Sequence, residues 1–549
     1  MKRRNFLSLS KQDDTFIDND TPTSSVALQT LPEFATRTTA GLEPYTPNGA
    51  NPWDYSKAAH LLRRCMVGPK DSEIRKAVTD GLDATIKLLL TPFTPSTVEI
   101  KSWVGTDVEV RPPNNIVDSP EFKAWQTTQF NHREQLVKWW VKTIATSPVS
   151  IQERMVMMWH NHFANEINTV NFAEYMLVQN QLFRKFIFGN FKQFVKDITK
   201  DPSMLIYLDG VKNFKTGNRN QINENYAREI QELFTCGVSD WDNKPNYTET
   251  DVSEAARALS GWTIMGSTTK DTNYFLGLTS IFIPTRWDSG NKIFMGKTGA
   301  WKADDIVDII FSERADQVAK FICTKIYREL VYDVPDREII EQMATTFRSN
   351  NWELKPVIEQ LIQSEHFFDA TNIGAKDKSP IDFMVGAIRT LGLTTVPDFD
   401  LTQSGRNSQD LIFRMQSIGQ VPCYPPNVKG WPGGRTWVST STLPLRQKFL
   451  LDVADQKVVI QKVTYYKLDA IAFAKTFPSY NDATKLTQEI AQALLNVQPS
   501  QQEFDALLEA LLQGAKTYEW KIDDPTFQAG NHIRNLLKAI VRLAKHELF

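Results

Sequence analysis

Two histidines separated by a single residue are the first feature of this chain that could do chemistry. His160 and His162 lie in segment 153–163, where Met155, Met158 and Trp159 recur at helical spacing. Histidine binds metals and transfers protons near neutral pH. Side chains two positions apart on a helix point roughly 200° apart, so these two do not reach one metal from the same regular turn. We therefore favour a hydrogen-bonded core histidine at 162 and a supporting or surface histidine at 160 over metal ligation.

A carboxylate-bearing helix is expected over segment 223–234. Its apolar side recurs at helical spacing, and Asn225 and Glu229 share the polar side. Glu229 with Asn225 could bind a cation or act as a general acid or base, and Arg228 could contact a ligand. The alternative is a charged, solvent-exposed helix face on which Glu224 pairs with Arg228. Taken alone, this segment favours the alternative.

Two loops carry further candidates. Asp288 lies in a glycine-containing turn within segment 286–292, where it is either a site residue or an ordinary turn former. The loop at 417–441 is rich in Pro and Gly, and its Trp431 could stack on a flat or sugar-like ligand. The same loop could instead be a structural lid over the helical body, and the sequence leaves these two alternatives even.

The elements that must position these residues are mainly helices. The pattern predicts a mainly α protein, a large multi-helix globular body with a small β-hairpin or sheet insertion near 262–300. Along the chain we expect a flexible N-terminal arm at 1–50, an aromatic-rich helical region at 51–261 and the β-rich insertion at 262–301. A second helical region at 302–549 contains the Pro/Gly/Trp loop.

Composition excludes several classes of function. The 62 basic and 64 acidic residues leave a net charge of -2, which argues against general binding of nucleic acid. No uncharged apolar run is long enough to span a bilayer, so we expect a soluble protein without a membrane span. The four cysteines are scattered and indicate no metal site. Arg3-Arg4-Asn5-Phe6-Leu7 is similar to a twin-arginine export signal but lacks the apolar stretch, so a cytoplasmic location is the default and export the alternative.

The ordered set of motifs resembles a bacterial family catalogued as domain of unknown function 1800. The matching stretches are residues 58–64, 153–163, 223–229, 247–252, 256–262, 321–326, 364–367 and 419–432. The resemblance implies an association with members of a second family, domain of unknown function 1501, which have a phosphatase- or sulfatase-like fold. Where relatives of this family commonly carry His-Asp and His-Pro, this chain has Trp287-Asp288 and Ala315-Asp316.

Two hypotheses about function follow. The one we favour is a non-catalytic interaction or assembly protein that acts with a phosphatase- or sulfatase-like partner, because the two missing histidines weaken any chemistry that depends on them. The alternative is a hydrolase-like enzyme without an evident cofactor, although a divalent metal is compatible with it. The enzyme hypothesis predicts that two sets of residues share one open pocket. The catalytic set is Glu229, Asp288 and His160. The ligand-binding set is His162, Asn225, Arg228 and Trp431.

Overall fold

Helices make up most of the part of the chain that the computed structural model describes, namely residues 34–109, 119–216, 219–266, 275–393, 411–457, 459–460, 463–464 and 466–549. Most of the arm predicted at 1–50 therefore lies outside the described residues. The mainly α prediction is confirmed, since every sheet within these ranges has only two strands. No described helix combines the length and the apolar run that a bilayer crossing requires.

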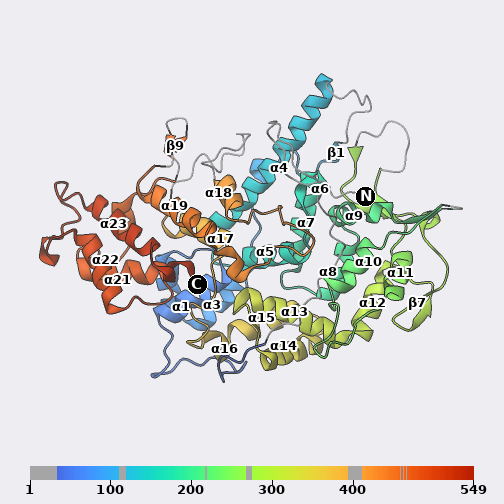
Figure 1. Ribbon diagram of the computed structural model, residues 1–549, viewed down its shortest axis with the longest axis horizontal. Coiled ribbons are helices and arrows are strands. Elements are labelled where there is room, and N and C mark those ends of the chain that lie inside the picture. The colour runs from blue at the N-terminus through green and yellow to red at the C-terminus, as the bar shows by residue number, and fades with distance from the viewer. Residues whose placement is uncertain are drawn as a thin grey trace, which may run out of the picture. The chain divides into compact units, whose positions relative to one another are not determined.

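The first half of the chain forms eleven of the described helices, which run from blue to green in Figure 1. They are α1 (Tyr55–Cys65), α2 (Asp71–Asp80), α3 (Leu82–Leu89), α4 (Pro120–Thr146), α5 (Gln152–His162), α6 (Ile167–Val170), α7 (Ala173–Phe186), α8 (Phe191–Thr199), α9 (Pro202–Tyr207), α10 (Asn225–Glu232) and α11 (Glu249–Ala258). The aromatic residues predicted for this region form its core. Trp159 of α5 stacks on Phe191 of α8 at 5.5 Å between ring centroids, and Phe163 meets Phe194 edge-on at 4.9 Å.

The second half contributes the remaining helices of the described chain. They are α12 (Ala303–Glu313), α13 (Ala315–Leu330), α14 (Arg337–Ser349), α15 (Leu354–Ile362), α16 (Glu365–Phe368), α17 (Pro380–Thr390), α18 (Leu411–Ser417), α19 (Thr442–Ala454), α20 (Ala470–Ala474), α21 (Ala483–Leu494), α22 (Gln501–Leu512) and α23 (Ala529–Val541). Residues 32–549 form one compact unit, so the regions expected at 51–261, 262–301 and 302–549 share a single core.

The small β insertion is confirmed by two antiparallel pairs. β4 (Trp262–Ile264) pairs with β6 (Ser280–Phe282), and β7 (Lys292–Phe294) pairs with β8 (Lys297–Gly299). Three further pairs were not expected from the sequence: β1 (Val108–Glu109) with β5 (Phe275–Leu276), β2 (Phe214–Thr216) with β3 (Arg219–Gln221), and β9 (Val459–Ile460) with β10 (Val463–Thr464).

The described end of the expected arm is bound to the helical body. The amide of Tyr45 donates to the carbonyl of Gln363, and the amide of His366 donates to the carbonyl of Gly41. His366 Nδ1 donates to the carbonyl oxygen of Ala40 at 3.1 Å, and its Nε2 accepts from the Tyr327 hydroxyl at 2.9 Å. Residues 40–45 therefore belong to the folded body, although the sequence placed them in the arm.

Helix α5, near the centre of the view in Figure 1, contacts helices from both halves of the chain. Arg154 of α5 forms a two-pronged ion pair with Asp382 of α17, at 2.6 and 3.0 Å, and also contacts Glu329 of α13 at 3.4 Å. Its neighbour Glu153 pairs with Arg184 of α7. These buried charges satisfy one another, which fixes α5 against helices from both halves.

Candidate functional site

A cavity of about 670 Å³ opens beside α5, α13 and the loop at 417–441. Its volume falls in the range of small-molecule sites. Helix α5 contributes Asn161 and His162, α13 contributes Lys325 and Arg328, and the loop contributes Trp431 among other residues. The cavity thus brings together two segments that the sequence singled out, the Trp-His-Asn-His segment and the Pro/Gly/Trp loop.

The Trp-His-Asn-His segment holds three different pieces of backbone. His160 Nε2 accepts a hydrogen bond from the amide of Cys423 at 3.1 Å, and Asn161 Oδ1 accepts one from the amide of Trp431 at 2.6 Å. His162 Nε2 lies 3.1 Å from the carbonyl oxygen of Phe234, to which it donates. His162 is the core histidine that we expected. His160 is also buried, at 1% exposure, which excludes the surface alternative and leaves the supporting one.

The loop is a wall of the cavity. The Trp431 side chain is only 5% exposed, and its ring lies 5.6 Å from the His160 ring. Gly430 has φ +77° and lies so close to Asn161 that a Cβ would not fit there. A Cβ at Gly434 would lie 2.6 Å from the Asp333 carboxylate. These close approaches support the structural alternative for most of the loop, with Trp431 as part of the cavity wall.

The polar residues of α10 do not line this cavity. Asn225 is exposed and donates to Asp209 at 3.3 Å, and Arg228 forms a two-pronged ion pair with Glu249 at 2.8 and 2.7 Å. Burial and the charge of Glu232 raise the pKa of Glu229 to about 7. The two residues that follow α10 contact side chains of the cavity wall: the carbonyl of Leu233 accepts from Lys325, and the carbonyl of Phe234 accepts from His162.

Asp288 lies in a separate, closed ion-pair cluster. Its carboxylate accepts from Arg257 at 2.9 Å, from Lys215 at 3.1 Å and from the amide of Gly290 at 3.0 Å. Burial alone would raise the pKa of Asp288, but these donors hold it well below its usual range. The cavity does not include Asp288, so it does not bring this carboxylate together with His162 and Trp431. Within the described ranges, no three His, Cys, Asp or Glu side chains gather in a way that could hold a metal ion.

Lys325 is a residue of the cavity wall that the sequence did not single out. It lies on α13 and lines the cavity, and its Nζ donates at a long 3.5 Å to the carbonyl oxygen of Leu233. Burial, together with the charge of Arg328, lowers the pKa of Lys325 to about 7. No carboxylate in the described structure lies within ion-pair distance of this lysine. An amine in this setting can bind an anion or react as a nucleophile.

His162 complements Lys325 across the same cavity. Its side chain is 3% exposed, and its Nδ1 has no hydrogen-bond partner in the described part of the chain. Because a carbonyl oxygen only accepts, Nε2 must carry the proton and Nδ1 the lone pair. Burial, together with the charge of Lys325, lowers the pKa of His162 well below its usual value, so the ring is neutral.

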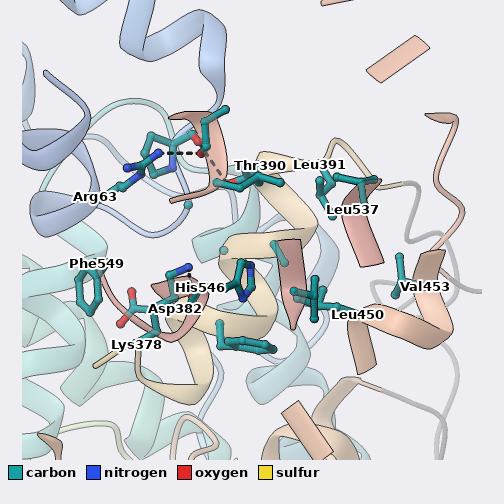
Figure 2. Close-up of a pocket in the computed structure, with 18 of the residues that line it drawn as sticks. Arg63, Lys378, Asp382, Thr390, Leu391, Leu450, Val453, Leu537, His546 and Phe549 are labelled. Atoms are coloured by element: carbon teal, nitrogen blue, oxygen red, sulfur yellow. Dashed lines mark hydrogen bonds between the residues drawn. The ribbon is translucent and has the colours of Figure 1, made fainter. Parts of the chain in front are cut away.

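A second, much smaller cavity of about 70 Å³ lies between α17, α19, α21 and α23. Figure 2 shows the basic and acidic side chains of Lys378 and Asp382 on one side and the apolar Leu450, Val453 and Leu537 on the other. The space is too small for a typical organic ligand. We therefore take the larger cavity as the candidate site.

Comparisons with known proteins identify the family alone. No curated protein and no solved structure matches the chain. A family model described as Protein of unknown function (DUF1800) matches residues 60–542, which is most of the 549-residue chain. This confirms the resemblance noted in the motifs: the chain belongs to the DUF1800 family.

Proposed function

We propose that this protein binds a small organic anion in the cavity beside α5 and α13. The observation that carries the proposal is the surplus of positive charge on the cavity wall. Lys325, Arg328 and Arg435 line the cavity. None of the three forms an ion pair within the described part of the chain, although the charge of Asp333 acts on Arg328 and Arg435 acts on Asp377. Ordinary surface cations need no partner, but cations gathered in a concave site favour an anionic ligand.

The acidic residues of the wall are mostly engaged with other groups. Asp382 and Glu329 both contact Arg154, at 2.6 and 3.4 Å, and Asp333 lies 3.6 Å from Lys376. An incoming anion therefore meets three carboxylates that are already paired, and a fourth, Asp377, whose pKa is raised by burial and by the nearby charge of Asp333. The non-catalytic role beside a phosphatase- or sulfatase-like partner stays a prediction, and it agrees with a protein that holds an anionic molecule without transforming it.

Thermal unfolding at constant ionic strength tests the proposal, with inorganic phosphate, sulfate and glyoxylate as separate probes. A ligand at 100 times its Kd should stabilise the native state by about 2.7 kcal/mol. We expect a rise in Tm that is lost in Lys325→Met and retained in the matched control Lys320→Met. Lys320 lies on the same helix but pairs with Asp316 at 2.8 Å, away from the cavity. The proposal would be overturned if every anion stabilised both variants equally. It would also be overturned if no anion stabilised the wild type.

The pH dependence provides a second readout. Because the pKa of Lys325 is about 7, its positive charge is present at pH 6 and largely absent at pH 8.5. Anion binding that uses this charge should weaken as the pH rises through about 7. The same titration with Lys325→Met should show a flatter profile.

A further inference from the structure

We propose that Lys325 forms a covalent imine with a ligand that carries an aldehyde or keto group next to its anionic group, such as a small 2-oxo acid. This inference rests on the proposed function, because it uses the same cavity and the same cations. It adds to the proposed binding a covalent reaction between the ligand and Lys325. Lysine amines that react with carbonyl groups need an accessible nitrogen, a neutral form near physiological pH and a nearby group that moves protons.

The surroundings of the Lys325 nitrogen meet the first requirement. Its one hydrogen bond in the described structure is the long 3.5 Å contact with the Leu233 carbonyl, so the amine is not locked in an ion pair. Glu329, four residues later on the same helix, contacts Arg154 instead. The cavity gives a ligand access to this amine.

The neutral form is favoured by the same surroundings. Burial removes water from the ammonium, and Arg328 adds a like charge one turn along α13. The pKa of Lys325 is thereby lowered to about 7, so much of the amine is neutral at physiological pH. Arg328 and Arg435, which also line the cavity, can hold the carboxylate of the ligand while the carbonyl carbon meets Nζ.

His162 supplies the group that moves protons. Its Nε2–H is fixed on the Phe234 carbonyl at 3.1 Å, which leaves the Nδ1 lone pair free in a buried ring beside the cavity. A buried acceptor without a hydrogen bond destabilises the folded protein unless a ligand, a water or a reacting proton binds to it. We assign this nitrogen the role of relaying the proton that leaves Nζ.

The reaction balances without any further reagent. The Nζ lone pair attacks the carbonyl carbon, a C–N bond forms, and the C=O π electrons move to oxygen. One proton passes from nitrogen through His162 Nδ1 to that oxygen, which gives a carbinolamine. The nitrogen lone pair then expels the hydroxyl group, which takes the remaining proton of the nitrogen through the same His162 nitrogen and leaves as water, and the product is the neutral C=N bond.

Reductive trapping tests the inference on the full-length chain. Glyoxylate and cyanoborohydride are added at pH 7.5, and peptide mass spectrometry compares the modification of Lys325 with that of Lys320. Neutral amine is present in most molecules at a pKa of about 7, against about one in a thousand for an ordinary lysine, so we expect Lys325 to be trapped at least about ten times faster. His162→Gln should slow this trapping, and near-UV circular dichroism reports whether that variant keeps its fold.

The outcomes separate the two proposals. Trapping selective for Lys325 supports the imine. Stabilisation by phosphate, sulfate or glyoxylate that depends on Lys325, with trapping no faster than at Lys320, overturns the imine but leaves the binding site. Neither stabilisation nor selective trapping overturns both.

Discussion

Replacing Lys325 with methionine should make the free energy of unfolding less dependent on pH. The pKa of Lys325 is about 7 in the folded chain, against 10.5 for the free side chain. A lowered pKa means that the unfolded chain binds the extra proton between these values, so native stability rises with pH over this window and falls as the pH drops towards 7. Methionine keeps the aliphatic stem and removes the titrating group.

The size of the effect follows from the shift. At about 1.36 kcal/mol per pKa unit, the wild type should gain at most about 2.5 kcal/mol relative to Lys325→Met between pH 6.5 and pH 9. Because the Lys325 side chain is partly exposed to the cavity, we expect a gain of about 1 to 2.5 kcal/mol. Urea unfolding followed by tryptophan fluorescence at the two pH values measures this difference, provided that refolding curves superimpose.

The comparison has a built-in control. Other titrating groups change equally in wild type and variant, so only the difference between the two pH profiles concerns Lys325. Lys320→Met should follow the wild-type profile. If wild type and Lys325→Met gain the same stability from pH 6.5 to pH 9, the amine is not perturbed by its surroundings, and the reasoning about the cavity is wrong.

Three substitutions test the framework around the site. Arg154→Met should lower the free energy of unfolding by about 3–5 kcal/mol, because Asp382 is left buried without its cation, and adding Asp382→Asn should recover part of the loss in urea unfolding. Gly430→Ala should lower Tm by several degrees in calorimetry, because φ is +77° and a Cβ would meet helix α5. Arg257→Ala should destabilise the protein at pH 7 by about 2–4 kcal/mol. The loss should shrink as the pH falls below 4, since the lowered pKa of Asp288 contributes stability only above that range; a loss that is constant with pH would contradict this assignment.

Much of the fold could be predicted because local patterns agree with the final packing. Apolar residues at helical spacing placed the helices, and the β insertion expected near 262–300 contains β4, β6 and β7. The segment at 40–45 was misjudged because it has no periodicity. Its order comes from backbone hydrogen bonds to residues more than 300 positions away, which no local pattern reports.

The candidate site was harder to predict because internal pairing and ligand binding use the same residue types. Asp288 and Glu153 carry charges in conspicuous motifs, yet each is neutralised by an arginine from another element. A motif rich in polar residues is therefore equally typical of a buried structural network. Only the three-dimensional pairing distinguishes the two.

Lys325 shows the converse case. In sequence it precedes Glu329 by four residues on a predicted helix, a spacing that is typical of a solvent-exposed ion pair. In the structure Glu329 instead forms an ion pair with Arg154, which also pairs with Asp382. Lys325 is therefore left without the partner that its sequence spacing suggests. The positive charge left over at the cavity is thus a consequence of the buried network that holds α5, α13 and α17 together. If that network sets the reactivity of the amine, Arg154→Met should release Glu329 to Lys325, raise the pKa of the lysine and slow its reductive trapping, in variants that remain folded.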